Sequence, residues 1–388
     1  MEIDMTEIID SALDRSKWIK WKFSELFENV VEKVVPKKSG IEHYIGLEHL
    51  DSGSLHIKRF GETASLIGDK LKIYKGDIIF AKRNAYLKRA SIAPFDAVVS
   101  AHSLVLRSKS NNVLSDFIPF FLMSEEFWER AIEISVGSLS PTINWKILAK
   151  QEFLLPPKEE QAKLAELLWA MDEVIEKEKE VLERQENVFL SYSDLIFSNG
   201  IGNFIELSKI GTLIMGQSPD GGTYNEDKNG MPFLQGNAEF GDISPKFVKY
   251  TTEPNKIAPK NSILISVRAP VGDLNIANRE YCIGRGLAAL FIENESLRNY
   301  VFNFLKYSKT ELDKRSTGST FKAVNKDALS TLKLRLPTEK VIQENSNKLS
   351  VILSTIENSK SQINSSLSLQ KSLINQVFSF SVNTLADK

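Results

Sequence analysis

The chain of 388 residues is 42% hydrophobic and 26% charged, a composition typical of a globular protein with two or three domains. Its 49 Lys and Arg nearly balance its 50 Asp and Glu, so composition indicates no global basic surface for nucleic acid. The single cysteine, Cys282, excludes an intramolecular disulfide and a thiolate zinc cluster. The acidic start MEIDMTEIID lacks a signal-peptide core, and no apolar run approaches the roughly 20 residues of a membrane span. We expect a soluble, cytoplasmic protein with no membrane partner.

Residues 1–155 predict a β-rich domain that carries a few helices. Short apolar runs such as DIIF and VVSAHSLVLR alternate with clusters of Gly, Pro, Asn and Asp, which is the pattern of short strands and turns. One helix is predicted over DFIPFFLMSEEFWERAI, residues 116–132.

A basic run at residues 69–89 is the candidate polar surface of this domain. Its second half follows an apolar strand and supplies Lys82, Arg83, Asn84, Lys88 and Arg89. Lys and Arg can bind phosphates, while Arg and Asn can also make paired hydrogen bonds to guanine and adenine edges. An ordinary solvated strand surface is the alternative interpretation.

Residues 156–200 predict a long helix that begins after two prolines. Leu167, Val174, Val181 and Val188 recur every seven residues, and a second apolar row, which includes Leu168 and Ile175, repeats beside them. One helical partner covers only part of so wide a stripe, so a further helix or the adjacent β-domain is expected on the rest. Five Lys and Arg against eleven Asp and Glu make this segment repel phosphate.

Residues 201–336 predict a second β-rich domain with a net charge of +4, from eighteen Lys and Arg against fourteen Asp and Glu. Polar side chains that could approach a nucleic-acid groove lie on its Gly-rich loops: Gln217, Ser218, Tyr224, Gln235 and Asn237. Solvent-facing turns are the alternative. Arg268 and Arg285 are stronger candidates, because the first aligns with Arg83 and the second lies beside glycines in a strand-like run.

Residues 337–380 predict a second long helix, followed by a tail at 381–388. Its packing row is Leu349, Ile356 and Ile363, and Gln370 interrupts the repeat. Antiparallel pairing of the two long helices buries both stripes with short connections. The predicted fold class is therefore α+β, with two β-rich domains joined by two long antiparallel coiled-coil helices and held at opposite ends of a helical rod.

The two halves of the chain resemble each other. A shift of 181 residues places Phe23, Glu25 and Leu26 on Phe204, Glu206 and Leu207, and Gly137, Ser138, Asn144 and Leu155 on Gly318, Ser319, Asn325 and Leu336. Between these blocks the shift drifts to 184–185 and aligns KGDIIFAKR (75–83) with KNSILISVR (260–268). A tandem duplication with an approximate two-fold relation explains these matches.

The motifs of common enzymes are missing from the sequence. It contains no G-x-x-x-x-G-K-[ST], no G-x-G-x-x-G and no H-E-x-x-H. His43, His49 and His56 are spaced in a way that points at no single metal centre, so we interpret them as solvated. PDGGTYNEDK (219–228) has an acidic order seen in some nucleases, but Gly-Gly favours a flexible loop. We predict no catalytic residue and no metal site in this chain.

The chain resembles the specificity subunit of type I restriction-modification systems from about Trp18 to Phe380. The segments that carry the resemblance are VGSLSPTINWKILAKQEFLLPPKEEQAKLAELL (136–168), TGSTFKAVNKDALSTLKLRLPT (317–338), GQSPDGGTYN (216–225) and GMPFLQGNAEF (230–240). The departure is KVIQEN in the second helix, which lacks the Glu-Gln pair kept in EEQ at 159–161. This departure puts the partner contacts of the second helix in doubt.

The resemblance implies that each β-rich domain is a target-recognition domain that reads one half of a bipartite site in double-stranded DNA. The helices would set the spacing and dock two modification (methyltransferase) subunits, which would bind S-adenosylmethionine and methylate adenine. Restriction (translocase and nuclease) subunits would join to cleave DNA. No cofactor is expected in the chain itself.

Other functions fit parts of the pattern. One is a specificity chain for a fused restriction-methylation enzyme of the type IIB kind, which a neighbouring reading frame with nuclease and methylase motifs would favour. Another is a coiled-coil scaffold whose heads bind proteins, which predicts no salt-dependent DNA binding. A stand-alone enzyme is disfavoured by the missing motifs.

Overall fold

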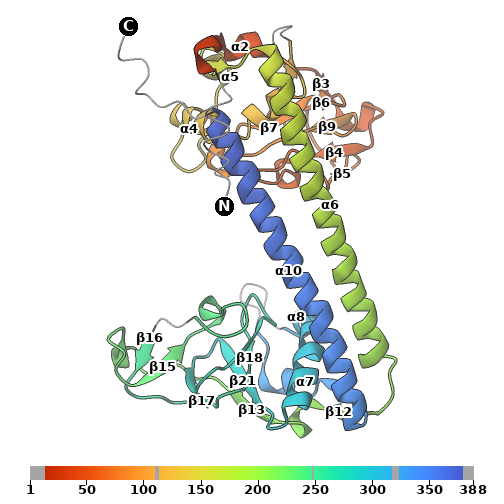
Figure 1. The fold of residues 1–388 in the computed structure, drawn as a ribbon, viewed down its shortest axis with the longest axis vertical. Helices are drawn as coiled ribbons and strands as arrows, with labels where there is room; N and C mark the ends of the chain where they lie inside the picture. Colours follow the sequence, from red (N-terminus) through yellow and green to blue (C-terminus); the bar gives the residue numbers. More distant parts are fainter. Residues whose placement is uncertain (1–13, 110–112, 247–248, 317–322, 379–388) are drawn as a thin grey trace. The chain divides into compact units, whose positions relative to one another are not determined.

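The computed structural model describes residues 14–109, 113–246, 249–316 and 323–378. The chain folds into two compact units (Figure 1): unit 1 comprises Met1–Lys179 with Gln362–Lys388, and unit 2 comprises Glu180–Ser361. No helix within these described ranges is long and apolar enough to cross a membrane. The predicted tail at 381–388 and the repeat matches Gly318 and Ser319 lie outside the described residues.

Unit 1 contains three small sheets. A two-stranded ladder pairs β1 (Ile19–Lys22) with β11 (Glu152–Leu155). A four-stranded sheet has the order β2 (Phe27–Asn29), β10 (Ser103–Ser108), β7 (Ile78–Ala81), β8 (Ala90–Ile92). A five-stranded sheet has the order β3 (Lys33–Val34), β6 (Lys70–Ile73), β9 (Ala97–Val99), β4 (His43–Ile45), β5 (Gly61–Glu62). All pairs are antiparallel except β4 with β9.

Unit 2 repeats this plan. Its ladder pairs β12 (Asn203–Glu206) with β22 (Lys333–Leu336). Its four-stranded sheet has the order β13 (Thr212–Met215), β21 (Leu287–Phe291), β18 (Ile263–Ser266), β19 (Leu274–Ile276). Its five-stranded sheet has the order β14 (Tyr224–Asn225), β16 (Lys249–Thr251), β15 (Met231–Leu234), β20 (Tyr281–Ile283), β17 (Ile257–Ala258), and β15 runs parallel to β20.

The continuous apolar runs form strands that are buried on both faces. In β7, Ile78 and Phe80 face one hydrophobic cluster, whereas Ile79 and Ala81 face another. In β18, Ile263 and Ile265 face one cluster and Leu264 faces the other. Because successive side chains of a strand point to opposite faces, such a strand needs apolar residues at every position. The runs DIIF and SILIS in the sequence follow from this arrangement.

The predicted repeat is confirmed, but its register at the start of each copy was wrong. The Phe23 N–H donates to Gln151 O at 2.8 Å, and the Leu207 N–H donates to Leu332 O at 2.8 Å, so Phe23 corresponds to Leu207 and not to Phe204. Phe23 is fully buried, whereas Phe204 is 53% exposed. The sequence match between FSEL and FIEL therefore does not reflect structural equivalence. The equivalent positions share burial and backbone hydrogen bonds, and not residue identity.

The helix predicted over 116–132 is two helices. They are α3 (Ile118–Phe121) and α4 (Glu125–Glu133), and between them Ser124 has extended backbone angles and accepts the Phe127 N–H at its Oγ. A serine in this position caps the start of a new helix. The apolar pattern of residues 116–132 therefore spans two helices and not one. The other short α-helices among the described residues are α2 (Phe23–Leu26) and α5 (Trp145–Leu148) in unit 1, and α7 (Glu295–Tyr307), α8 (Lys309–Arg315) and α9 (Lys326–Ser330) in unit 2.

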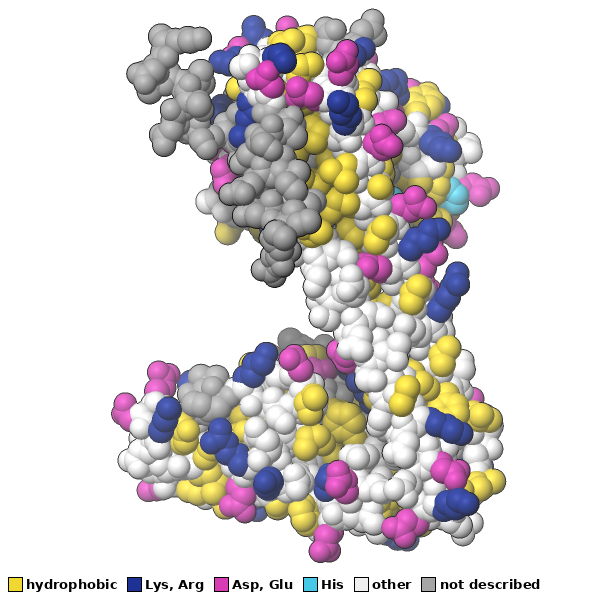
Figure 2. Space-filling model, in the orientation of Figure 1, with side chains coloured by type: hydrophobic (Ala, Val, Ile, Leu, Met, Phe, Trp, Pro, Cys, Tyr) yellow, Lys and Arg dark blue, Asp and Glu magenta, His cyan; other side chains and the backbone are white. Residues whose placement is uncertain are grey.

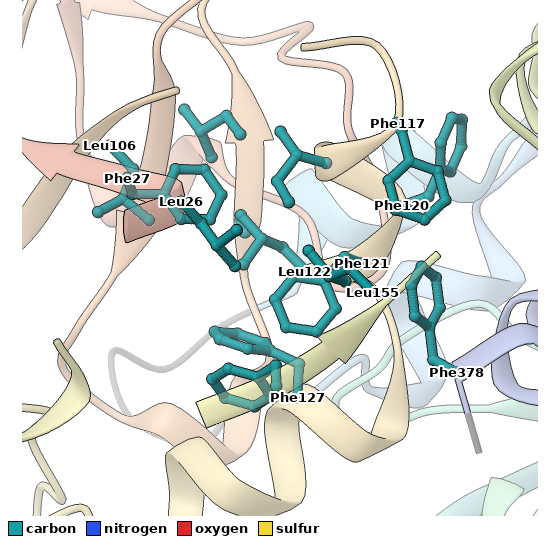
Figure 3. Close-up of a cluster of buried hydrophobic side chains, with 14 of the residues drawn as sticks. Leu26, Phe27, Leu106, Phe117, Phe120, Phe121, Leu122, Phe127, Leu155 and Phe378 are labelled. Atoms are coloured by element: carbon teal, nitrogen blue, oxygen red, sulfur yellow. The ribbon is translucent and has the colours of Figure 1, made fainter. Parts of the chain in front are cut away.

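A phenylalanine-rich core anchors the C-terminal end of the second long helix in unit 1. Figure 3 shows Phe378 beside Phe117, Phe121 and Leu155, and the Phe378 ring centroid lies 5.4 Å from that of Phe117 and 5.5 Å from that of Phe121. Aromatic pairs at these separations add to the free energy of burying the rings. Residues that are distant in the sequence therefore share one core.

The two long helices are α6 (Lys158–Phe197) and α10 (Glu339–Phe378), each of 40 residues and about 60 Å long (Figure 1). In unit 1, the Ser366 Oγ donates to Glu178 Oε1 at 3.2 Å, and Leu168 shares a core with Ile374. In unit 2, the Tyr192 hydroxyl donates to Asn345 Oδ1 at 3.0 Å, and Lys360 Nζ lies 3.4 Å from Glu186 Oε1. In both units, residues with higher numbers in α6 contact residues with lower numbers in α10. The two helices therefore run antiparallel, as predicted.

Only one of the two predicted apolar rows of α6 is buried within the chain. Leu167, Val174, Val181 and Val188 were predicted to pack against a helix or a partner subunit, and they are 42%, 54%, 48% and 54% exposed in this chain, so they do not form its internal packing face. The neighbouring row is buried, with Leu168 and Ile175 at 0% and 2% exposure. Adjacent helix positions differ by about 100° around the axis, so covering one row leaves the next open. On α10 the predicted row Leu349, Ile356 and Ile363 is buried.

Candidate nucleic-acid interface

The turn between β20 and β21 of unit 2 presents Arg285 to solvent. The Leu287 N–H donates to Gly284 O at 3.0 Å and closes the turn. A Cβ on Gly286 would lie 2.6 Å from Gln235 O, and one on Gly284 would lie 3.1 Å from Gln235 Cα. The backbone of Gln235 therefore packs against the turn and leaves no room for a side chain at Gly286. Arg285 is exposed between these two glycines.

The loop after β15 places two more predicted residues near this turn. Gln235 is exposed, and the following Gly236 N–H donates to Glu239 Oε2 at 3.0 Å. Asn237 Nδ2 donates to Asp273 Oδ2 at 2.8 Å, which leaves Asn237 half-buried. Gln235 thus keeps its carboxamide at the surface, whereas one donor of Asn237 is used within the unit.

The loop after β13 approaches the turn from another direction. The Gln217 N–H donates to Ile283 O at 2.9 Å, and Ser218 Oγ accepts the Arg285 N–H at 3.3 Å. Tyr224 supports this loop: its hydroxyl donates to Pro219 O at 3.0 Å, and its ring stacks on that of Phe233 with centroids 4.8 Å apart. Gln217 is exposed, whereas Ser218 and Tyr224 are half-buried.

Arg268 completes the group. The preceding Val267 N–H donates to Gly286 O at 2.9 Å, so the exposed Arg268 follows directly after a residue bonded to the turn. We call the exposed side chains Gln217, Gln235, Arg268 and Arg285 the unit 2 cluster. They come from four separate loops and form a polar surface with two guanidinium groups and two carboxamides.

Unit 1 has a smaller surface of the same kind. Arg83 is exposed, and its Nε donates to Ser140 Oγ at 2.8 Å, which in turn donates to Asn84 Oδ1 at 2.7 Å. Lys82 is half-buried, and this burial lowers the pKa of its ammonium group. Its backbone N–H donates to His102 O at 3.3 Å.

Comparison with known proteins identifies the family. The family model described as the type I restriction modification DNA specificity domain matches residues 17–184 and matches a second time at residues 203–369. The chain belongs to this family. Each match joins the sheets of one unit to most of one long helix, and this specificity subunit therefore carries two recognition domains.

Relatives agree with this assignment. The chain is 31% identical over 324 residues, 75% of each sequence, to a Methanocaldococcus jannaschii protein provisionally assigned as the MjaX specificity subunit of a type I restriction enzyme. A solved structure from work on complex assembly and conformational transition of the type I R-M system is 27% identical, with a TM-score of 0.59 over 93% of this chain and 97% of that chain. The type I S subunit from M. genitalium, 17% identical, has the same fold, with a TM-score of 0.58 over 94% of this chain and 96% of that chain.

Two of the predicted DNA-binding residues are engaged within the specificity subunit. Lys88 forms an ion pair with Glu125, which also lies 3.0 Å from Lys371 Nζ. These two ammonium groups lower the pKa of the Glu125 carboxyl. Arg89 Nη1 donates to Leu47 O at 2.6 Å. The structure therefore gives Lys88 and Arg89 internal contacts, while Arg83 remains exposed beside them in the sequence.

Sequence reasoning missed two side chains at the unit 1 surface, Ser140 and His102. Ser140 bridges Arg83 and Asn84, and His102 is exposed in the turn before β10. The alignment of KGDIIFAKR with KNSILISVR could have indicated His102. Its shift of 184–185 residues aligns His102 with residues 286–287, next to Arg285. Lone histidines have no local pattern that could have shown this.

The interpretation of the three N-terminal histidines as solvated was wrong. The His43 ring packs against Phe60 and Phe95, His49 Nδ1 accepts the Gly46 N–H at 3.0 Å, and His56 Nε2 lies 2.5 Å from Asp172 Oδ2. Among the described residues, no group of His, Cys, Asp or Glu has the arrangement of a metal site.

Figure 2 shows the charged side chains on one face of the specificity subunit. On the face shown in Figure 2, Lys and Arg side chains are interspersed with Asp and Glu in both units. A continuous basic surface on this face is therefore not available to hold DNA by charge alone.

Proposed function

We propose that the two units bind double-stranded DNA and that each reads one half of a bipartite target. The observation that carries this proposal is the presence of exposed Arg side chains on corresponding loops of both units, with exposed Gln beside them in unit 2 and exposed His in unit 1. Arg pairs with guanine O6 and N7, and Gln or Asn pairs with adenine N6 and N7 in the major groove. Lysines around these loops would contact phosphates and make the affinity depend on salt.

The long helices would act as the spacer and the docking surface. We propose that the exposed row Leu167, Val174, Val181 and Val188 packs against helices of two modification (methyltransferase) subunits. Apolar residues at seven-residue spacing on a solvent-facing helix side are the usual requirement for such helical packing. Restriction subunits would join the same assembly.

The chain itself is proposed to be non-catalytic. Methyl transfer would take place on the modification subunits, which would bind S-adenosylmethionine. The role of this chain is then to raise the local concentration of those subunits at sites with two correct half-sites at the correct spacing.

Single-molecule mapping of modified adenines tests this function. DNA would come from a methylation-free host that expresses this chain with its neighbouring modification gene, or that gene alone. We expect a new split motif only when both are present. A stable complex of the two proteins that neither produces a split motif nor binds DNA in a salt-dependent way would contradict the proposal and favour the scaffold function.

A further inference from the structure

We propose that residues 100–103 of unit 1 and 284–287 of unit 2 are paired base-reading turns, in which His102 is the reading side chain of the first turn and Arg285, beside Gln235, that of the second. His102 aligns with Gly286, and the residue that aligns with Arg285 is Ala101. This inference rests on the proposed function and extends it to particular residues. It makes His102 a specificity-determining residue of the first half-site and the Arg285–Gln235 pair that of the second.

The two turns have the same backbone hydrogen bonds. In unit 1, the Ser103 N–H donates to Ser100 O at 3.0 Å, and in unit 2 the Leu287 N–H donates to Gly284 O at 3.0 Å. Each turn joins the buried strand of the five-stranded sheet to the central strand of the four-stranded sheet, β9 to β10 and β20 to β21. The turns are therefore equivalent under a shift of 184 residues.

The surroundings of the turns are equivalent as well. In each turn, the carbonyl oxygen of the third residue accepts the backbone N–H of the residue before the exposed arginine. The Lys82 N–H donates to His102 O at 3.3 Å, and the Val267 N–H donates to Gly286 O at 2.9 Å. The arginines themselves, Arg83 and Arg268, form isolated bridges with Thr142 and Ala323. Each turn thus lies beside an exposed arginine that is held in the same way.

One inserted residue distinguishes the two surfaces. The Ser100 N–H donates to Ile45 O at 3.2 Å, and the Gly284 N–H donates to Leu234 O at 2.7 Å, so Ile45 corresponds to Leu234. Gly46 follows Ile45 directly and begins the next short turn, whereas in unit 2 Gln235 stands between Leu234 and the corresponding Gly236. Gln235 is therefore an additional exposed side chain with no counterpart in unit 1.

The side chains at these places differ in the base edges they can recognise. In unit 1 the exposed turn residues are Ala101 and His102, and one imidazole N–H can donate to a purine acceptor such as N7. In unit 2, Arg285 offers a two-pronged donor suited to guanine, and Gln235 offers a donor and an acceptor suited to adenine. The two half-sites should therefore differ, with stronger discrimination at the position read by Arg285.

The test compares modified motifs made by the complete complex carrying His102→Ala, Arg285→Ala or Gln235→Ala. We expect Arg285→Ala to lose roughly 5- to 150-fold discrimination at one base of one half-site. His102→Ala should relax one base of the other half-site only. Lys75→Ala and Lys260→Ala are matched controls: these equivalent exposed lysines precede β7 and β18, at the strand ends opposite the turns, and should leave both half-sites unchanged.

A second measurement covers variants that produce no modification. Purified complexes would be tested by competition binding on oligonucleotides with each base at the relevant position, and Arg285→Lys would keep the charge but lose the planar fork. Failure of the native complex to select any split motif would refute the proposed function. If the native motif is split but His102→Ala and Arg285→Ala leave both half-sites intact, or both relax the same half-site, the pairing of the turns is wrong.

Discussion

At His56, a loop of unit 1 is tied to α6 by two charged contacts. His56 Nε2 lies 2.5 Å from Asp172 Oδ2, and Lys58 Nζ lies 2.6 Å from Glu176 Oε2. The hydrogen bond to Asp172 raises the pKa of His56, and burial opposes this shift. The charge of Glu176 also raises the pKa, whereas the charge of Lys179 lowers it, and the net shift is upward. Protonated His56 therefore stabilises the folded state of unit 1.

This contact predicts a pH-dependent loss of stability. The pKa of His56 in the folded state lies above its unfolded value of about 6.5. The charged contact therefore contributes fully to the free energy of unfolding below about pH 6.5, and this contribution disappears as the pH rises through the folded-state pKa. We expect His56→Gln to lower the free energy of unfolding by about 1 kcal/mol or less near pH 6, and the deficit to shrink by about pH 9. Thermal unfolding of both proteins measures this, with His102→Gln as the exposed control. A deficit independent of pH would contradict the assignment.

At the scale of elements, α6 shows how much a heptad pattern determines. The start and the end of the helix lie within three residues of the predicted 156–200, because apolar spacing and the leading prolines are local signals. The pattern did not show which of the two apolar rows is buried, because coverage depends on where α10 and the sheets pack. A wide apolar stripe can be buried along more than one of its rows of residues, and only the tertiary contacts determine which row is buried.

The exposed row of α6 gives an element-scale prediction. The double variant Val174→Gln and Val181→Gln should change the free energy of unfolding by no more than about 0.5 kcal/mol, since both side chains are already half in water. It should weaken assembly with the modification subunit, measured by titration or size-exclusion chromatography. Ile175→Gln, at a buried position, should instead destabilise the fold. Unchanged assembly by the double variant would remove this row from the docking surface.

At the scale of the whole molecule, duplication governs the design. Both units repeat the two-stranded ladder, the order of the four-stranded sheet, a five-stranded sheet with one parallel pair, and the bridge between an exposed arginine and the loop before a short helix. Similar scaffolds with different loop side chains are suited to reading two different half-sites.

Lengthening both long helices tests their proposed role as a spacer. One extra heptad after Glu180 in α6 and one after Ser361 in α10 preserves the apolar phase and adds about 10 Å to each helix. We expect the preferred gap between half-sites to increase by about three base pairs at roughly 3.4 Å each, with both half-sites unchanged. Mapping of modified adenines measures the gap. An unchanged gap with normal modification would show that the helices do not set it.

The sequence by itself determined the two long helices, the short buried strands, the duplication and the family, because these depend on local periodicity, prolines and repeated residues. The tertiary structure decided which polar residues share a surface. Gln217, Gln235, Arg268 and Arg285 meet through backbone hydrogen bonds between four loops, while Lys88 and Arg89 are held by internal partners. Such contacts join residues far apart in the chain, and no local spacing encodes them.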